Sequence, residues 1–320
     1  MEKKKIYFLA PKNKWGTYYY YIDISDYLIK YNSDEYNIVF CNSLLDYIKL
    51  HFVKSDIIFS IIPFFFKPLF TKKYIFNLHW NFKVERKNHS LGVKLLYLSE
   101  LNLWFSDQIM LTSFYLADKL KFREKYNDKI IIVPNFVEKT RIKNQQLEMN
   151  NFNFMTITSF KFYDKWKWIV NLWNVIKIIA EKNLDKQINF TIIWNEENNI
   201  FHKIKYEFDK INFWENVSII WKWWLSKNEI EKEFLIHNNF LYWSELDNYP
   251  GVILEAINYN LKVYVNNFES FKYFLDERII CENINEMIER YDEKIYANKT
   301  KIFSLDNIVK DNIISLIKNK

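Results

Sequence analysis

Two carboxylates stand out by their spacing and by the pattern around them. Asp247 and Glu255 lie eight positions apart in FLYWSELDNYPGVILEAI, residues 240–257. The first part of this stretch reads as a buried strand. A helix is expected to start near Pro250, since proline is tolerated in a first helical turn. This places Asp247 at the carboxyl end of a strand and Glu255 in the first turns of a helix, whose free backbone N–H groups can bind an anion.

A lysine cluster accompanies a second strand-to-helix turn. In ITSFKFYDKWKWI, residues 157–169, the cations are Lys161, Lys165 and Lys167. Cations beside a helix N-terminus suit a diphosphate. The alternative is that these lysines form a solvated surface cluster. For the two carboxylates, the alternative is an acidic loop residue and an acidic residue at a helix start that the helix dipole stabilises. The two stretches together predict a site for a phosphate-bearing small molecule.

The apolar pattern predicts the strands and helices around these residues. Short β-branched runs alternate with longer helical segments, which is typical of βαβ units and a parallel sheet. We expect strands at residues 5–10, 36–42, 56–62, 73–79, 108–112, 129–133, 152–159, 188–193, 217–220, 240–242, 262–265 and 278–281. We expect helices at 17–32, 43–53, 91–105, 114–126, 226–237 and 305–320. In the helix at 226–237, Ser226 and Glu229 match a capping box.

The polar segment 138–151 is the expected linker between two domains, which suits a chain of 320 residues. The predicted fold class is α/β, with two Rossmann-like domains facing a cleft. We expect one domain at 1–145 and a second at 146–304. The final helix, 305–320, is expected to pack back on the first domain.

Composition narrows the classes of function. The hydrophobic share of 49% is enough for two cores. The longest apolar runs, such as 57–66, fall short of the ~20 residues of a membrane span. The first residues lack signal-peptide features, and two cysteines cannot form a disulfide framework. A cytoplasmic protein is predicted, with peripheral contact at the inner membrane face as a further option.

The net charge of +6 is spread along the chain. Such a distribution predicts no nucleic-acid partner and suits anionic small molecules or an acidic membrane surface. The sequence contains no motif of other common enzyme classes. There is no G-x-x-x-x-G-K-[ST] loop, no G-x-S-x-G elbow and no His, Cys and Asp cluster with metal-ligand spacing.

The acidic stretch resembles the signature of the family 4 retaining glycosyltransferases, which have the GT-B fold and two carboxylates flanking seven residues. The first acid of that family is usually glutamate, whereas Asp247 has a shorter side chain. The resemblance implies that Asp247 is a catalytic residue that contacts hydroxyls of the donor sugar, and that Glu255 contacts the nucleotide ribose. It also places Pro250, Gly251 and Val252 at the donor site. By the same resemblance, 1–145 is the acceptor-side domain and 146–304 is the nucleotide-sugar-binding domain.

Further landmarks of that family follow in the same order along the chain. By resemblance, Lys161 takes the place of an arginine, and Lys165 and Lys167 are alternatives for the lysine that holds the donor diphosphate. We favour Lys167, because a helix is expected to open directly after it. Gly16 belongs to a turn where the family has paired glycines, and the acceptor and the donor phosphate would approach its backbone. His79 would contact the donor sugar as a catalytic residue. Ser113 and Asn135 would lie at the cleft.

The resemblance implies a retaining, hexosyltransferase-type enzyme. It would move a sugar from a UDP- or GDP-sugar to a glycan or lipid-linked acceptor in cell-surface polysaccharide synthesis. Lys161, Lys167 and helix N-termini would stabilise the leaving diphosphate without a metal or other cofactor. One alternative is a nucleotide-sugar 2-epimerase of the same fold, which needs more acid and base side chains at its site. Another is a degenerate, non-catalytic glycan-binding protein.

Glycine usage is anomalous. Average usage predicts about 22 glycines in this length, yet the chain has 3, beside 12 tryptophans. Glycine-like positions of the family pattern are filled by tryptophan at Trp15, Trp80, Trp166, Trp168, Trp194 and Trp221. We hypothesise that UGA codons meaning glycine were read as tryptophan, so that 3 + 12 = 15 glycines are restored. The alternative is a natural tryptophan-rich protein.

Overall fold

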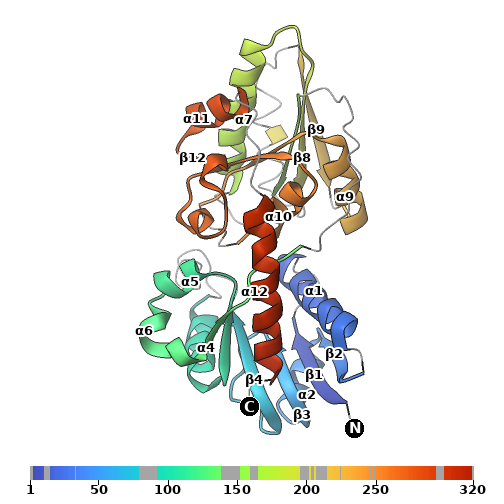
Figure 1. Ribbon diagram of the computed structural model, residues 1–320, viewed down its shortest axis with the longest axis vertical. Helices are drawn as coiled ribbons and strands as arrows, with labels where there is room; N and C mark the ends of the chain where they lie inside the picture. The colour runs from blue at the N-terminus through green and yellow to red at the C-terminus, as the bar shows by residue number, and fades with distance from the viewer. Residues whose placement is uncertain are drawn as a thin grey trace. The chain divides into compact units, whose positions relative to one another are not determined.

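The computed structural model divides into two compact units, Met1–Phe136 with Ser304–Lys320, and Val137–Phe303. It describes residues 3–10, 15–32, 34–78, 92–137, 152–158, 165–194, 202, 205–206, 215–223, 225–245, 247, 249–292 and 299–318. Each unit has a six-stranded sheet in which all strand pairs are parallel, with helices on both faces (Figure 1). The prediction of two parallel-sheet α/β domains is confirmed. The expected linker at 138–151 lies outside the described residues.

The sheet of the first unit has the order β2-β1-β3-β4-β5-β6. Its strands are β1 (Lys4–Leu9), β2 (Tyr36–Cys41), β3 (Ser55–Ser60), β4 (Thr71–Leu78), β5 (Gln108–Leu111) and β6 (Ile130–Ile132). Its helices are α1 (Trp15–Asn32), α2 (Leu44–Leu50), α4 (Gly92–Phe105), α5 (Phe114–Lys119), α6 (Phe122–Tyr126), the short 3₁₀ turn η1 (Asn127–Lys129) and α12 (Lys299–Lys318). Residues of α1 and α12 share one core, and residues of α2, α4, α5 and α6 share the core of the opposite face.

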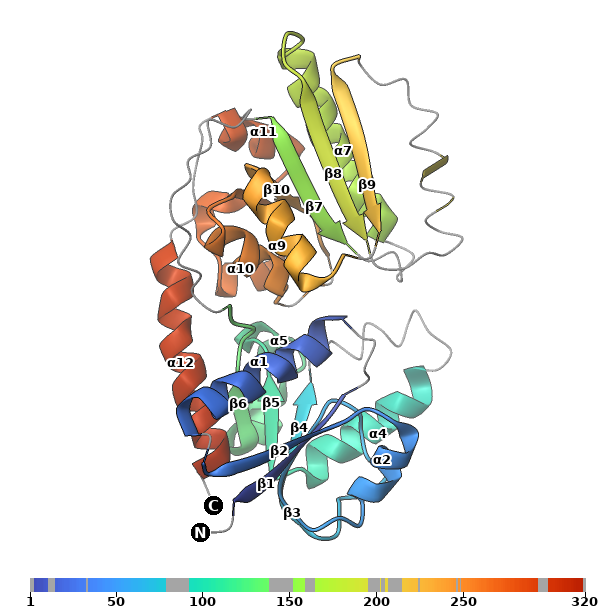
Figure 2. The same ribbon diagram turned by 90° about the vertical axis from the view of Figure 1, so that its right-hand side faces the viewer.

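Helix α12 brings the end of the chain onto the first sheet, as Figure 2 shows. Val309, Ile313 and Leu316 are buried in one core with Tyr21 of α1. The Asn312 amide donates a hydrogen bond of 2.6 Å to the backbone oxygen of Ile132 at the end of β6. The helix starts at Lys299, six residues before the predicted start.

One predicted helix is broken. The pattern over 114–126 predicts a continuous helix, but the structure has α5 and α6 separated at Lys121. Lys121 has φ 56°, in the left-handed region that ends a regular helix. The turn directs Phe122 into the core, where it is 6% exposed. Burial of that ring outweighs continuity of the helix.

The sheet of the second unit has the order β12-β11-β10-β7-β8-β9. Its strands are β7 (Asn153–Thr158), β8 (Ile188–Trp194), β9 (Val217–Trp223), β10 (Asn239–Tyr242), β11 (Lys262–Asn266) and β12 (Ile280–Cys281). Its helices are α7 (Lys165–Lys182), α9 (Lys227–Ile236), α10 (Gly251–Asn258), α11 (Ile284–Asp292) and the short 3₁₀ turns η2 (Glu269–Tyr273) and η3 (Glu277–Ile279). The predicted capping box of Ser226 and Glu229 is confirmed at the start of α9.

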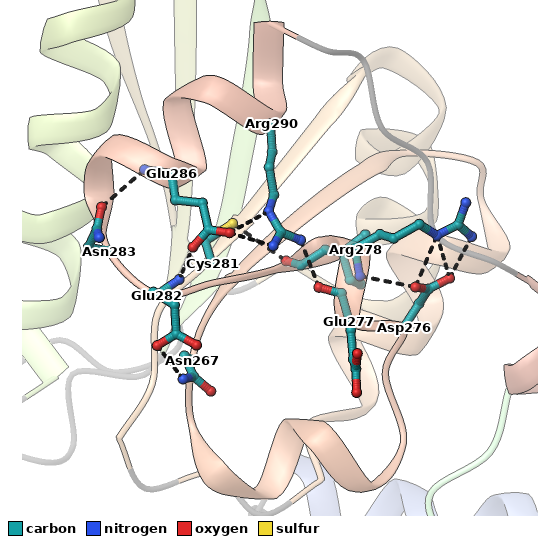
Figure 3. Close-up of polar contacts among 10 residues, drawn as sticks. Asn267, Asp276, Glu277, Arg278, Cys281, Glu282, Asn283, Glu286 and Arg290 are labelled. Carbon is teal, nitrogen blue, oxygen red and sulfur yellow. Dashed lines mark hydrogen bonds and ion pairs between the residues drawn. The ribbon is translucent and has the colours of Figure 1, made fainter.

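Polar contacts fix the turn from β12 into α11 (Figure 3). The Asn283 side chain accepts from the backbone N–H of Glu286, at 3.0 Å. The Glu286 carboxylate accepts from the backbone N–H of Glu282 at 2.6 Å and pairs with Arg290. Arg290 also donates to the backbone oxygen of Glu277, at 2.7 Å. These contacts lower the pKa of Glu286, chiefly through its backbone hydrogen bond, and give the charges a structural role.

A second polar cluster is buried between α9 and the sheet. Lys222 of β9 pairs with Glu233 at 2.6 Å. His237 has Nδ1 2.8 Å from the backbone oxygen of Glu233 and Nε2 2.8 Å from Thr191 Oγ1. Burial lowers the pKa of His237, against the raising effect of Glu233. The imidazole is therefore held neutral in the folded protein.

This cluster predicts acid sensitivity of the second unit. The unfolded chain binds a proton on His237 more readily than the folded chain does, so stability is complete above the unfolded pKa of about 6.5. It is lost as the pH falls through the lowered folded pKa. The unfolding midpoint of wild type should fall between pH 7 and pH 5, and His237→Gln should flatten this dependence. The exposed His202→Gln is the control, measured by thermal unfolding; an equal slope in His237→Gln and wild type would refute the assignment.

Candidate functional site

Strand order in the second unit singles out one place on its sheet. The chain runs from β7 to β8 and β9 in one direction, and then returns to β10, β11 and β12 on the other side of β7. Strands β7 and β10 are parallel neighbours at this reversal (Figure 2). Ligands of open α/β sheets bind outside the carboxyl ends of strands at such a reversal. Both stretches chosen from the sequence lie there, because Lys165 opens the helix after β7 and Asp247 follows β10.

Asp247 is held by a network of hydroxyl groups. Its Oδ2 accepts from the Tyr242 hydroxyl at 2.6 Å and from Ser244 Oγ at 3.0 Å. Its backbone N–H donates to Ser244 Oγ at 2.9 Å, and its backbone oxygen accepts from Ser270 Oγ at 3.0 Å. The Asn266 side chain in turn bonds both backbone groups of Ser244. The half-buried carboxylate is thus fixed in direction before any ligand binds.

The electrostatics of this pair keep Tyr242 a donor. Burial raises the pKa of Tyr242 well above its ordinary value, and the neighbouring charge of Asp247 raises it further. A phenol that stays protonated donates to the carboxylate throughout the physiological range. A hydrogen bond to a charged group of this kind contributes about 1.5–3 kcal/mol.

Helix α10 presents its start to the same loop. Pro250 is the N-cap residue, and its side chain makes no capping bond to the first N–H groups of the helix. A Cβ built on Gly251 would meet no atom within 4 Å. Residues 253, 254 and 256–258 are buried, which leaves Gly251, Val252 and Glu255 on the half-buried face. Gly251 and Glu255 are one turn apart and share that face.

Helix α7 opens at Lys165, so the expectation that it opens after Lys167 is wrong. Lys167 is the third residue of the helix and is exposed. The first turn of α7 holds no acidic residue, although the helix dipole favours negative charge there. Lysines in this position are unfavourable to the helix itself and favourable to a bound anion. Lys161 lies outside the described residues, and of Lys165 only the backbone is described.

The sheet of the first unit has its own reversal between β1 and β3. Gly16 is the second residue of α1, the helix that follows β1. His79 follows β4 directly and lies outside the described residues. Ser113 is the N-cap of α5, where its Oγ accepts from the backbone N–H of Leu116 at 3.2 Å. Asn135 is half-buried after β6.

Sequence reasoning missed the residues that hold Asp247. It gave no role to Tyr242, Asn266 or Ser270. A signal existed, because Tyr242 and Asn266 are polar residues at the carboxyl ends of neighbouring buried strands. Their contact with the Asp247 loop depends on strand order, which periodicity does not reveal.

Two features that would indicate other functions are absent from the described residues. No three or more His, Cys, Asp and Glu side chains of the described chain gather closely enough to hold a metal ion. No helix in the described ranges has both the length and the apolarity of a membrane span.

No family model and no curated protein sequence matches the chain. Solved structures do. Anabaena HepE in complex with UDP and glucose matches with a TM-score of 0.64 and 12% identity, over 98% of this chain and 97% of that one. The lipopolysaccharide outer core galactosyltransferase WaaB, in its apo form, matches with a TM-score of 0.62 and 12% identity, over 98% and 99%.

A mutant of S. aureus TarM in complex with fondaparinux, alpha-GlcNAc-glycerol and UDP matches with a TM-score of 0.56 and 14% identity. The match covers 81% of this chain and 52% of TarM, so the chain spans about half of that protein. At these identities the likeness concerns the fold. Two parallel-sheet α/β domains, each with its strand reversal, give this chain the GT-B fold of those glycosyltransferases.

Proposed function

We propose that this protein is a retaining glycosyltransferase that takes its sugar from a nucleotide-diphosphate sugar. The observation that carries the proposal is the reversal of strand order between β7 and β10. It brings together an anchored carboxylate, the start of α10, whose N-cap residue is a proline, and the start of α7, which is rich in lysine. A nucleotide sugar has matching parts, namely sugar hydroxyls and a diphosphate.

Each part of the donor has a candidate partner. Glu255 accepts from the ribose hydroxyls, and Asp247 accepts from hydroxyls of the sugar. Lys165 or Lys167 and the N–H groups of α7 bind the diphosphate, with Lys161 beside them by resemblance. His79 contacts the donor sugar, also by resemblance.

The leaving diphosphate carries the charge that develops in the reaction. Lysines and helix N-termini oriented in advance stabilise such charge. The proposed reaction therefore needs no metal or other cofactor. We propose a UDP- or GDP-sugar as the donor, because both contain the diphosphate that the lysines and helix N-termini would bind.

The solved structures of similar fold support the ligand class. HepE was solved with UDP-glucose, and pneumococcal GtfA with UDP and GlcNAc. WaaB acts on the lipopolysaccharide outer core by its name. For this chain we propose a glycan or lipid-linked acceptor and a role in cell-surface polysaccharide synthesis.

Glu255→Gln tests the donor site. It replaces a charged acceptor of ribose hydroxyls by a neutral one, which costs about 1.5–3 kcal/mol and should raise the Kd of UDP-sugars roughly ten- to hundredfold. Binding is measured by calorimetry and by thermal stabilisation in EDTA, for UDP- and GDP-sugars. Turnover is measured as release of nucleoside diphosphate.

The matched control is Glu245→Gln, an exposed carboxylate in the same loop, which should bind like wild type. Equal binding by Glu255→Gln and wild type would refute the role of Glu255. Loss of activity in EDTA restored by Mg²⁺ would refute the metal-free mechanism. Sugar epimerisation without an acceptor would indicate a 2-epimerase, and glycan binding without any nucleotide-sugar binding would indicate a non-catalytic protein.

A further inference from the structure

Exposed apolar side chains gather on one short stretch of the first unit. Eight of the nineteen exposed large hydrophobic residues in the described chain lie between residues 44 and 70. They are Leu44, Leu45, Ile48, Phe52, Phe65, Phe66, Leu69 and Phe70, and they are 43–76% exposed. Scattered apolar residues are normal on a protein surface, whereas a gathered patch marks an interaction site.

Local structure makes these residues one surface. Helix α2 turns Tyr47 and Leu50 into the core, so Leu44 and Ile48, one turn apart, point away from it. No helix connects β3 to β4. Instead, the segment 61–70 lies on the face of the sheet that α2 covers, and Phe64 shares a core with Tyr47 and Leu50 of α2. The segment lies beside the end of α2, where the backbone N–H of Leu69 donates to the backbone oxygen of His51 at 2.9 Å.

Aromatic contacts continue across this junction. The ring of Phe66 is 4.4 Å from that of His51 and 6.3 Å from that of Phe52, between ring centroids. Phe65 packs edge-on against Tyr47. Phe64, between strand β3 and these exposed rings, is fully buried. The exposed rings therefore stand on a packed base. We call the eight residues the apolar patch.

Two exposed lysines accompany the apolar patch. Residues 43–73 contain five lysines and two aspartates, but Lys67 pairs with Asp107 at 2.6 Å. Asp46 is bound by Ser43 in the capping box of α2, and Asp56 accepts from Lys72 at 2.6 Å. Lys49 and Lys54 are exposed and form no ion pair within the described residues.

We propose that the apolar patch and its lysines dock the first unit on an anionic lipid bilayer. Exposed aromatic and aliphatic side chains enter the boundary between headgroups and acyl chains, while flanking lysines attract anionic headgroups. A second copy of the chain fits less well. A two-fold contact sets the patch against itself. It brings Lys49 and Lys54 of one copy towards the same two lysines of the other, while both aspartates are bonded within the chain.

Vesicle flotation tests the docking. Wild type should float with vesicles of phosphatidylcholine containing a third phosphatidylglycerol, and much less with pure phosphatidylcholine. Leu44→Ser with Phe65→Ser should lower the bound fraction at least tenfold. Lys49→Gln with Lys54→Gln should abolish the preference for anionic vesicles.

The control pair is Leu184→Ser with Leu235→Ser, two residues of similar exposure in the second unit, which should float like wild type. Circular dichroism and thermal unfolding establish that each variant folds. Failure of wild type to float, or equal flotation of the patch variant, would overturn the proposal. A dimer of wild type in solution that the patch variant loses would assign the surface to a second copy. Donor binding is measured separately, so the donor site stands or falls on its own test.

Discussion

Replacing Asp247 by asparagine should lower kcat roughly ten- to hundredfold, with a smaller effect on donor KM. The carboxylate is proposed to accept from sugar hydroxyls in a position fixed by Tyr242 and Ser244, whose hydroxyls both donate to Oδ2. Loss of a charged hydrogen bond at the sugar costs about 1.5–3 kcal/mol. Initial rates of nucleoside diphosphate release at saturating donor measure the effect.

Tyr242→Phe separates positioning from contact. It removes the 2.6 Å hydrogen bond to Asp247 and keeps the ring in its packed place. We expect a loss of kcat smaller than that of Asp247→Asn, because Ser244 still bonds the carboxylate. Glu245→Gln, in the same loop, should leave kcat unchanged. If Asp247→Asn lowered only the unfolding temperature and left kcat intact, the carboxylate would be structural.

The central strands could be predicted because their residues are buried on both faces. A parallel sheet covered by helices produces continuous apolar runs, which read clearly in a single sequence. The run 188–193 corresponds to β8, which extends one residue further to Trp194. A helix start could also be predicted from local sequence, because Ser226 and Glu229 form the expected capping box of α9.

The rest depends on contacts that the chain makes only when folded. The left-handed turn at Lys121 interrupts a helical pattern because a distant core receives Phe122. Asn266 bonds Ser244 from 22 residues away, because β11 is the neighbour of β10. Periodicity identifies strands without their order, so the residues anchoring Asp247 stayed hidden. The positions of His79 and Lys161 lie outside the described residues.

Some described tryptophans lie at element boundaries, where glycine is common, and some have buried indoles. Trp15 opens α1, Trp168 lies in the first turn of α7 and Trp194 ends β8, all at element boundaries. Trp221 lies inside β9. No described tryptophan has positive φ, since the described non-glycine residues with positive φ are Lys121 and Asn260. Trp194 is 6% exposed and packs edge-on against Trp221 at 5.6 Å between ring centroids.

Backbone conformation therefore does not require glycine at the described positions. Glycine would serve there by its lack of a side chain, which allows a helix start to approach a strand or a phosphate closely. Trp168 is informative in this respect. Its indole is 5% exposed in the first turn of α7, next to the proposed diphosphate site. A hypothesis of glycine at these positions is thus a hypothesis about space for the donor.

Replacing the set Trp15, Trp80, Trp166, Trp168, Trp194 and Trp221 by glycine should raise the affinity for UDP-sugars at least tenfold. Glycines at 166 and 168 cost the helix about 1 kcal/mol each, yet thermal stabilisation by UDP-sugar should increase. The control is Trp173→Gly, in the middle of α7 and 3% exposed; its cavity should destabilise by about 3–5 kcal/mol without improving binding. The gene gives the most direct measurement. UGA codons at the six positions are the expected result, and UGG codons throughout would establish tryptophan. With UGG codons, the buried indole of Trp168 at the start of α7 would be native, and a non-catalytic protein would be favoured.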